Sequence, residues 1–316
     1  MSEVPSIAAL SIATPVEGQP IPTPEEIAAC RDFIYEEDPG KNRGSKVLRF
    51  GKYAVKYGGR TEFREVENMK FLTKYPKIAA PKYRAHGYLP GAKGGDSKGE
   101  LYIVTDYIEG ETVEAAFNKL SPVDKEGVIR LIREQINEIR KIPDEGYLGG
   151  VGGTHYVNNS LTIFKNQLKL PPGADASPER LGPFATYDAF VDSWMQRLTD
   201  EPTQEPFKPV STICNKMARE IWGTNTRTVF THGDLAPKNI MLTRLGTNPD
   251  GSGIFRVTII DWDVAGFYPE WWEFADAPLW WGSTPAWWVE SIEKIMPTYF
   301  SERWVYAFYW QYLVFY

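Results

Sequence analysis

Two short stretches decide the fold: Thr231–Leu242, which reads THGDLAPKNIML, and Ile259–Asp263, which reads IIDWD. In the first stretch Asn239 follows Asp234 by five positions, and Asp261 in the second follows Asn239 by 22. Transfer of a phosphoryl group from a nucleotide needs hard oxygen ligands for magnesium and a carboxylate that orients the receiving hydroxyl. This pattern supplies those groups. It therefore predicts Asp234 as the base and Asn239 and Asp261 as metal ligands.

A lysine and a glutamate upstream complete this set. Lys56 lies in the β-rich run YAVKYG, where its ammonium could reach the nucleotide phosphates. Glu67, eleven residues on, lies in a predicted helix over 61–75 and could hold Lys56 by an ion pair. Glu65 is the competing partner, and only one of the two can face the strand because they are about 200° apart around the helix. Protein kinases use the same residue types with the same Asp-to-Asn spacing.

The N-terminal third predicts a small sheet with one packed helix. Residues 1–24 are rich in Pro, Ser and Ala and predict an extended lead-in, followed by a helix over 25–35. A hairpin is expected around Gly51–Lys52, and the run Glu100–Asp106 after the 61–75 helix predicts a buried strand.

The remainder predicts a larger and mainly helical part. Ser121, Pro122 and Asp124 form a helix start signal. The Gly- and Pro-rich residues 143–183 predict an irregular insertion. The other expected elements are helices over 184–199 and 209–222, strands over 228–232 and 255–261, and helices after Trp271 interrupted at Pro278, Pro285 and Pro297. The fold class is therefore α+β, divided into the lead-in 1–24, an N-terminal lobe 25–107 and a C-terminal lobe 108–316.

Composition excludes several classes of function. The chain of 316 residues has a net charge of −6 and no basic stripe, which argues against a nucleic-acid partner. Two cysteines are too few for a disulfide framework, so a reducing, cytoplasmic location is expected. The N-terminus lacks a secretory signal, and no apolar run is long enough to predict a membrane span.

Aromatic residues are concentrated near the C-terminus. Residues 262–316 contain 9 of the 11 Trp, 6 of the 17 Tyr and 5 of the 16 Phe. Helix packing explains such an excess because aromatic side chains bury large areas. The alternative is that some of these rings line a pocket for the molecule that is acted on, with Glu270 and Glu273 as its polar contacts.

The quoted motifs carry a resemblance to a known family. HGDLAPKNI followed by IDWDVAGFYPEWWE resembles the aminoglycoside phosphotransferase and choline kinase-like family, and VKYG, EVENMKFL and GFYPEWWE resemble its fungal branch. The resemblance runs from about Val47 to Trp281. It implies a bilobal protein kinase-like fold, with a small N-terminal β-rich lobe, a larger mainly helical C-terminal lobe, and ATP between them near the hinge TDYIEGET (105–112).

By position, the resemblance also implies roles for the motif residues. Asp234 would be the catalytic base, Asn239 and Asp261 would bind Mg²⁺, and His232 would brace the catalytic loop. The family acts on hydroxyl groups of small molecules such as aminoglycosides, choline or sugars.

The nucleotide contacts are expected in the N-terminal lobe. Lys56 and Glu67 would hold the ATP phosphates, and Asp106 lies in the hinge. The GxGxxG motif of protein kinases is absent, so the turn that contains Arg43 and Ser45 is expected to cover the phosphates instead.

Two hypotheses follow. The first is an ATP- and magnesium-dependent phosphotransferase acting on a small-molecule hydroxyl, with an acceptor whose body is apolar or aromatic as readily as polycationic. The alternative is a kinase-like nucleotide-binding scaffold without transfer activity, suggested by the missing glycine motif. The identity of the acceptor and the oligomeric state do not follow from the sequence.

Overall fold

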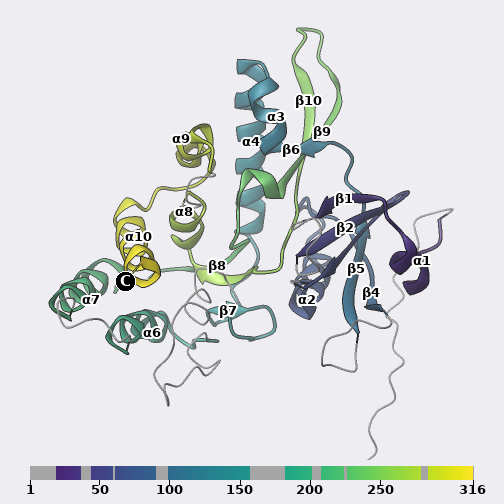
Figure 1. Cartoon of the computed structure of the whole chain (residues 1–316). Helices are drawn as coiled ribbons and strands as arrows, with labels where there is room; N and C mark the ends of the chain where they lie inside the picture. The colour runs from purple at the N-terminus through teal and green to yellow at the C-terminus, as the bar shows by residue number, and fades with distance from the viewer. Residues whose placement is uncertain are drawn as a thin grey trace, which may run out of the picture. The chain divides into compact units, whose positions relative to one another are not determined.

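The computed structural model describes residues 19–36, 44–59, 61–89, 99–156, 182–200, 208–223, 226–278 and 284–315, of which 197–200, 208–211 and 310–315 are described by their backbone alone. The chain divides into two units, Met1–Pro76 with Ala80–Glu109 and Lys77–Ala79 with Gly110–Tyr316. Figure 1 shows the helices and strands of both units. Among the helices of the described ranges, none is both long and apolar enough to cross a membrane.

The first unit is built on one antiparallel sheet with the strand order β1-β2-β3-β5-β4. Its strands are β1 (Phe33–Glu36), β2 (Ser45–Phe50), β3 (Tyr53–Gly58), β4 (Tyr83–Leu89) and β5 (Glu100–Asp106). The predicted hairpin is confirmed, since β2 pairs with β3 and Phe50 lies opposite Tyr53 across the turn at Gly51 and Lys52. The strand predicted over Glu100–Asp106 is confirmed as β5. Strand β4 was not expected, because its register comes from pairing with β5.

Two helices accompany this sheet, α1 (Pro24–Ala29) and α2 (Phe63–Leu72). Helix α2 confirms the helix predicted over 61–75. The helix predicted over 25–35 is wrong in its second half. A capping box at Thr23 starts α1, but the helix ends before Cys30, whose backbone is extended, and Phe33–Glu36 pairs with β2 as strand β1. The aromatic and β-branched residues of that run favour a strand once a partner edge is available.

The second unit is mainly helical and carries two small sheets. Its helices are α3 (Val113–Ala116), η1 (Phe117–Lys119), α4 (Pro122–Ile139), α6 (Tyr187–Asp200), α7 (Lys208–Trp222), η4 (Pro237–Asn239), α8 (Trp272–Asp276), α9 (Ala286–Ile295) and α10 (Phe300–Phe315). The sheets are β10-β9-β6, formed by Gly253–Ile259, Ile240–Thr247 and Glu111–Thr112, and β7-β11-β8, formed by Gly149–Gly150, Gly266–Pro269 and Thr228–Thr231.

Several helix predictions for this unit are confirmed. The hydroxyl of Ser121 accepts the amide of Asp124 and starts α4, and α9 lies alongside α4 (Figure 1). Helices α6 and α7 match the two predicted helices to within a few residues. The three helices after Trp271 are separated near the predicted prolines. Most of the predicted insertion 143–183 lies outside the described residues.

Buried aromatic rings form a core of the second unit. Trp194, Trp222, Trp271, Trp272 and Tyr306 are all fully or almost fully buried in one cluster. The indoles of Trp222 and Trp271 stack with their ring centroids 5.0 Å apart. Helix packing therefore accounts for most of the aromatic excess among the described residues.

Candidate active site

The predicted catalytic residues lie on a tight connection between β8 and β9. Strand β8 ends at Thr231, and the loop His232–Ala236 leads through the short helix η4 into β9. Gly233 has φ +83°, and a Cβ there would lie 2.8 Å from the carbonyl oxygen of Val264. Only glycine fits this backbone position without a shift. The loop thereby brings the side chains of Asp234 and Asn239 together.

Asn239 holds Asp234 by two hydrogen bonds. Its Nδ2 donates to the Asp234 carbonyl oxygen at 2.9 Å and to Oδ2 of the same residue at 3.0 Å. Both bonds use the amide nitrogen, so the amide oxygen, the kind of donor that magnesium prefers, is directed away from the carboxylate. Among the described residues, the buried Oδ1 of Asp234 has no hydrogen-bond partner.

The surroundings of Asp234 favour proton uptake. Burial is the main reason that its pKa is raised to about 7, and the negative charges of Asp276 and Asp261 add to the effect. Lys238 and the hydrogen bond from Asn239 act in the opposite direction. A carboxylate with one unpartnered oxygen and a pKa near neutrality can serve as a general base.

His232 joins this loop to the segment that carries Asp261. Its Nδ1 accepts the amide of Asp234 at 3.2 Å, and Nε2 lies 3.0 Å from the carbonyl oxygen of Ile260. The proton therefore resides on Nε2, which donates to Ile260. Burial lowers the pKa of His232 to about 4, so the ring is neutral. These contacts are those of a bracing residue.

Asp261 follows β10 in an uncommon backbone conformation. Its φ is +66°, which costs a non-glycine residue free energy and often occurs at functional sites. The Ile260 amide donates to the Asn239 carbonyl oxygen at 2.9 Å, which keeps the two predicted metal-ligand segments side by side. Trp262 is fully buried, donates its indole N–H to Ile259 at 2.8 Å and packs edge-on against His232.

The side-chain oxygens of Asn239 and Asp261 fit a magnesium ion whose remaining ligands are phosphate oxygens and water. Asn239 and Asp261 offer an amide oxygen and a carboxylate, and magnesium at nucleotide sites commonly uses only one or two protein oxygens. In the described part of the chain, no group of three or more His, Cys, Asp or Glu side chains could form a metal site by itself.

Glu273 is a site residue that the sequence assigned differently. It was expected as a possible contact of the acceptor, but it is buried and accepts the amides of His232 at 2.9 Å and Gly233 at 3.2 Å. Burial, reinforced by the charge of Asp276, raises the pKa of Glu273 to about 7. These hydrogen bonds hold the backbone of the loop His232–Ala236 in place. The available signal was a glutamate flanked by Trp272 and Phe274 in the aromatic run EWWEFA.

The predicted pair between Lys56 and Glu67 is wrong, and the competing Glu65 is the partner. Lys56 Nζ lies 2.8 Å from Glu65 Oε2. Glu67 instead pairs with Lys70 at 3.1 Å, and its side chain is 48% exposed. Helix α2 buries the face that carries Glu65, Val66 and Met69, whereas Glu67 lies on its exposed face.

The other predicted nucleotide contacts stay predictions. Ser45 is buried at the start of β2, and Arg43 lies outside the described residues. The Asp106 carboxylate is occupied by Arg84, whose Nε and Nη2 donate at 2.6 and 2.9 Å. This pair ties β4 to β5, so a nucleotide contact at this position is better made by the backbone than by the Asp106 side chain.

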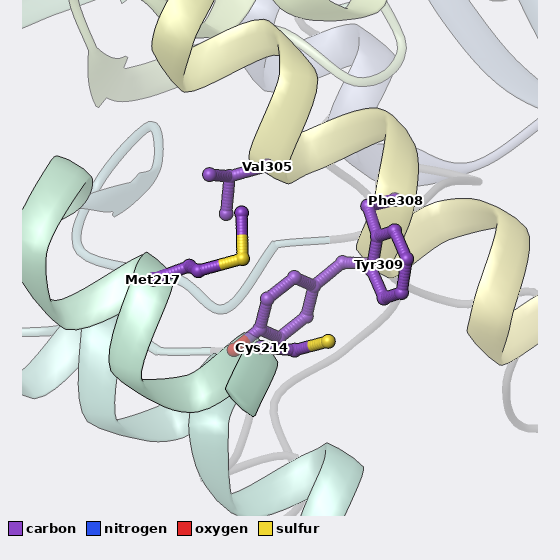
Figure 2. Close-up of a pocket in the computed structure, with 5 residues that line it drawn as sticks. All are labelled: Cys214, Met217, Val305, Phe308 and Tyr309. Carbon is purple, nitrogen blue, oxygen red and sulfur yellow. The ribbon is translucent and has the colours of Figure 1, made fainter. Parts of the chain in front are cut away.

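A separate apolar pocket lies in the second unit (Figure 2). It is lined by Cys214 and Met217 of α7 and by Val305, Phe308 and Tyr309 of α10. Met217 and Val305 point toward each other across it, and Tyr309 lies next to Cys214. None of these side chains is charged, so the pocket is no candidate for phosphoryl transfer.

Comparisons with known proteins identify the family of this chain. The profile described as "Phosphotransferase enzyme family" matches residues 40–290. No curated protein matches the chain. Nothing in these matches bears on the expected fungal branch, which stays a prediction.

Solved structures of aminoglycoside phosphotransferases share the fold. A ligand-free thermostable mutant of APH(4)-Ia is 13% identical, with a TM-score of 0.57 over 92% of this chain and 90% of that one. A ternary complex of APH(4)-Ia with ADP and hygromycin B gives 11% identity and a TM-score of 0.53 over 92% and 89%. The GDP complex of wild-type aminoglycoside 2'-phosphotransferase-IIIa is 12% identical, with a TM-score of 0.50 over 89% of this chain and 82% of that one. The expected α+β, kinase-like fold is thereby confirmed.

Proposed function

We propose, because this chain belongs to the phosphotransferase enzyme family, that it transfers the γ-phosphoryl group of ATP to a hydroxyl of a small molecule. The observation that carries this proposal is the buried Asp234, whose Oδ2 is held by Asn239 while Oδ1 has no partner among the described residues. That arrangement leaves one carboxylate oxygen to receive a proton.

Asp234 acts on the acceptor hydroxyl. As the hydroxyl oxygen bonds to the γ-phosphorus, its proton moves to Oδ1 of Asp234, and the bond from phosphorus to the bridging oxygen breaks to leave ADP. Asn239 keeps the carboxylate in one orientation throughout, since its amide bonds both the backbone and the side chain of Asp234. Asn239 and Asp261 hold Mg²⁺, which when bound neutralises charge on the phosphate oxygens.

Lys56 holds the ATP phosphates, and Glu65 fixes the direction of its ammonium group. The pair is largely buried, with 18% of the Lys56 side chain and 8% of the Glu65 side chain exposed. A buried lysine of this kind presents its charge with little freedom of motion, which suits a group that must meet a phosphate in one place.

The acceptor is a small molecule with a hydroxyl group. Aminoglycosides are one candidate class, because one of the similar structures contains hygromycin B. The composition suggested an acceptor with an apolar or aromatic body. Most aromatic rings of the second unit pack in its core, which weakens that suggestion. Among the described aromatic residues of the second unit, Phe300 and Trp304 are the most exposed, at 58% and 67%, and are the candidates for such a contact.

The test pairs a variant with a product search. Asp234→Asn is expected to lower kcat by on the order of 10³-fold, while the Kd for ATP with Mg²⁺ changes little. Products are sought by mass spectrometry after incubation of a metabolite extract with the enzyme and γ-labelled ATP. Nucleotide binding without any phosphorylated product across the extract and an aminoglycoside panel would favour the scaffold alternative.

A further inference from the structure

The turn between β2 and β3 is bound on one side by a residue that precedes the matched family region. Gln19 Nε2 donates to the Phe50 carbonyl oxygen at 2.7 Å, and its Oε1 accepts the Lys52 amide at 3.0 Å. The hydroxyl of Tyr53 in turn donates to the Gln19 carbonyl oxygen at 2.9 Å. One side chain thus pairs with the backbone on both sides of Gly51.

The same turn is bound on its other side by the segment that follows β5. The Tyr107 amide donates to the Lys52 carbonyl oxygen at 2.8 Å. Arg49 lies over the Tyr107 ring, 4.0 Å from its centroid, and pairs with Glu109. Lys52 therefore connects Gln19 to the backbone of Tyr107, because its amide donates to Gln19 and its carbonyl oxygen accepts the Tyr107 amide.

Helix α1 anchors Gln19 in the first unit. Ile27 of this helix is fully buried in the core beneath the sheet, and Ile21 packs against the same cluster. Gly51 has φ +55°, and a Cβ there would lie 2.6 Å from Gln19 Oε1. The turn and Gln19 therefore fit each other closely. Gln19 and α1 both lie outside the matched residues 40–290.

We infer that Gln19 is a positioning residue for nucleotide binding. By fixing the Lys52 peptide, it holds the backbone of Tyr107–Glu109, which belongs to the segment 105–112 where the resemblance expects ATP. This inference rests on the proposed function, ATP-dependent phosphoryl transfer, and on the expectation from the resemblance that the segment 105–112 is the hinge beside ATP. It assigns to residues 19–29, the N-terminal strap, a role in nucleotide affinity that is separate from their contribution to stability.

The experiment compares Gln19→Ala with Ile27→Val in the full chain. Ile27→Val weakens the packing of the strap without touching the turn, so it controls for lost stability. For Gln19→Ala, the Kd for ATP with Mg²⁺, measured by calorimetry, is expected to rise about five- to tenfold, whereas for Ile27→Val it stays within about twofold. Hydrogen exchange at the Tyr107 amide is expected to become faster in Gln19→Ala alone.

Two further variants sharpen the result. Gln19→Glu keeps an acceptor for the Lys52 amide but places a carboxylate against the Phe50 carbonyl oxygen, so an intermediate loss of affinity is expected. It also replaces Gln19→Ala if that variant does not fold. Gly51→Ala is expected to weaken ATP binding less in a Gln19→Ala background than in the wild type, because part of the clash is gone.

Failure of this inference is distinguishable from failure of the proposed function. If the wild type does not bind ATP, the proposed function is wrong. If the wild type binds ATP and Gln19→Ala matches Ile27→Val in both Kd and Tyr107 exchange, Gln19 has only a structural role and the inference is overturned.

Discussion

Two buried carboxylates at the loop His232–Ala236, those of Asp234 and Glu273, differ in the hydrogen bonds that their oxygens accept. Both oxygens of Glu273 accept backbone amides, whereas one oxygen of Asp234 has no partner among the described residues. Burial raises the pKa of both groups to about 7, yet only Asp234 has an oxygen left for chemistry. Hydrogen-bond geometry, and not the pKa, therefore distinguishes Asp234, the proposed base, from Glu273.

The raised pKa of Glu273 makes stability depend on pH. The folded state binds the proton more tightly than the unfolded state, whose pKa is near 4.5. The stabilisation is complete below pH 4.5 and is lost as pH rises through 7, by at most about 3 kcal/mol. Urea unfolding from pH 4.5 to 8 should therefore show a shallower fall for Glu273→Gln than for the wild type. If the free energy of unfolding fell equally steeply with pH in both proteins, Glu273 would not be the group that binds this proton.

The ion pair of Lys56 allows a matched comparison between two neighbouring glutamates. Glu65→Gln removes the partner of the lysine, and the Kd for ATP with Mg²⁺ is expected to rise about tenfold. Glu67→Gln alters a side chain that pairs on the surface with Lys70, so its Kd should stay within about twofold of the wild type. The reverse order would restore Glu67 as the functional partner.

How much of the site follows from sequence depends on how local its geometry is. Asp234 and Asn239 are five positions apart on one loop, so their spacing alone places them together. The choice between Glu65 and Glu67 depended on which face of α2 is buried, which the sequence left open. The role of Glu273 could not be predicted, because its partners are the backbone amides of His232 and Gly233, about forty residues away.

Among the elements, the five-residue helix α8 connects the aromatic core to the catalytic loop. Trp272 packs into the core, while Glu273 and Asp276, three residues apart, are buried acidic side chains of the same helix. The hydroxyl of Tyr306 on α10 donates to Asp276 Oδ1 at 2.5 Å. The C-terminal helix thereby supports the element that holds the loop.

Tyr306→Phe tests this support. It removes the donor from a buried carboxylate, and the free energy of unfolding should fall by about 1–3 kcal/mol. Tyr309→Phe is the matched control on the same helix, since its hydroxyl donates at 2.7 Å to the neutral amide oxygen of Asn215. Denaturant titration should show the larger loss for Tyr306→Phe. An equal loss would mean that the charge of Asp276 adds nothing.

Element predictions succeeded where the signal was local and failed where a partner strand decided the outcome. Gly51 marked the hairpin, and Ser121 with Pro122 marked the start of α4. Phe33–Glu36 reads equally well as the end of a helix, and only pairing with β2 makes it a strand. Strand β4, with Arg84 and His86 among its apolar residues, likewise takes its identity from β5.

At the scale of the whole molecule, bound nucleotide should stabilise the protein. At a concentration of ATP with Mg²⁺ one hundred times Kd, the gain is about 2.7 kcal/mol and appears as a higher Tm. Asp261→Asn should lose most of the magnesium-dependent part of this shift, because asparagine tolerates φ +66° but lacks the charge. EDTA should abolish the same part in the wild type. A magnesium-independent shift would argue against Asp261 as a ligand.

The aromatic core also gives the protein a built-in optical label. All 11 tryptophans lie at or beyond residue 194 and therefore belong to the second unit, whereas the first unit contains tyrosine as its only strongly emitting residue type. Tryptophan emission thus reports the second unit alone, and far-ultraviolet circular dichroism reports both. If the two units unfold at different temperatures, the melting curves from tryptophan emission and from circular dichroism will differ. If they unfold in one cooperative transition, the two curves will coincide.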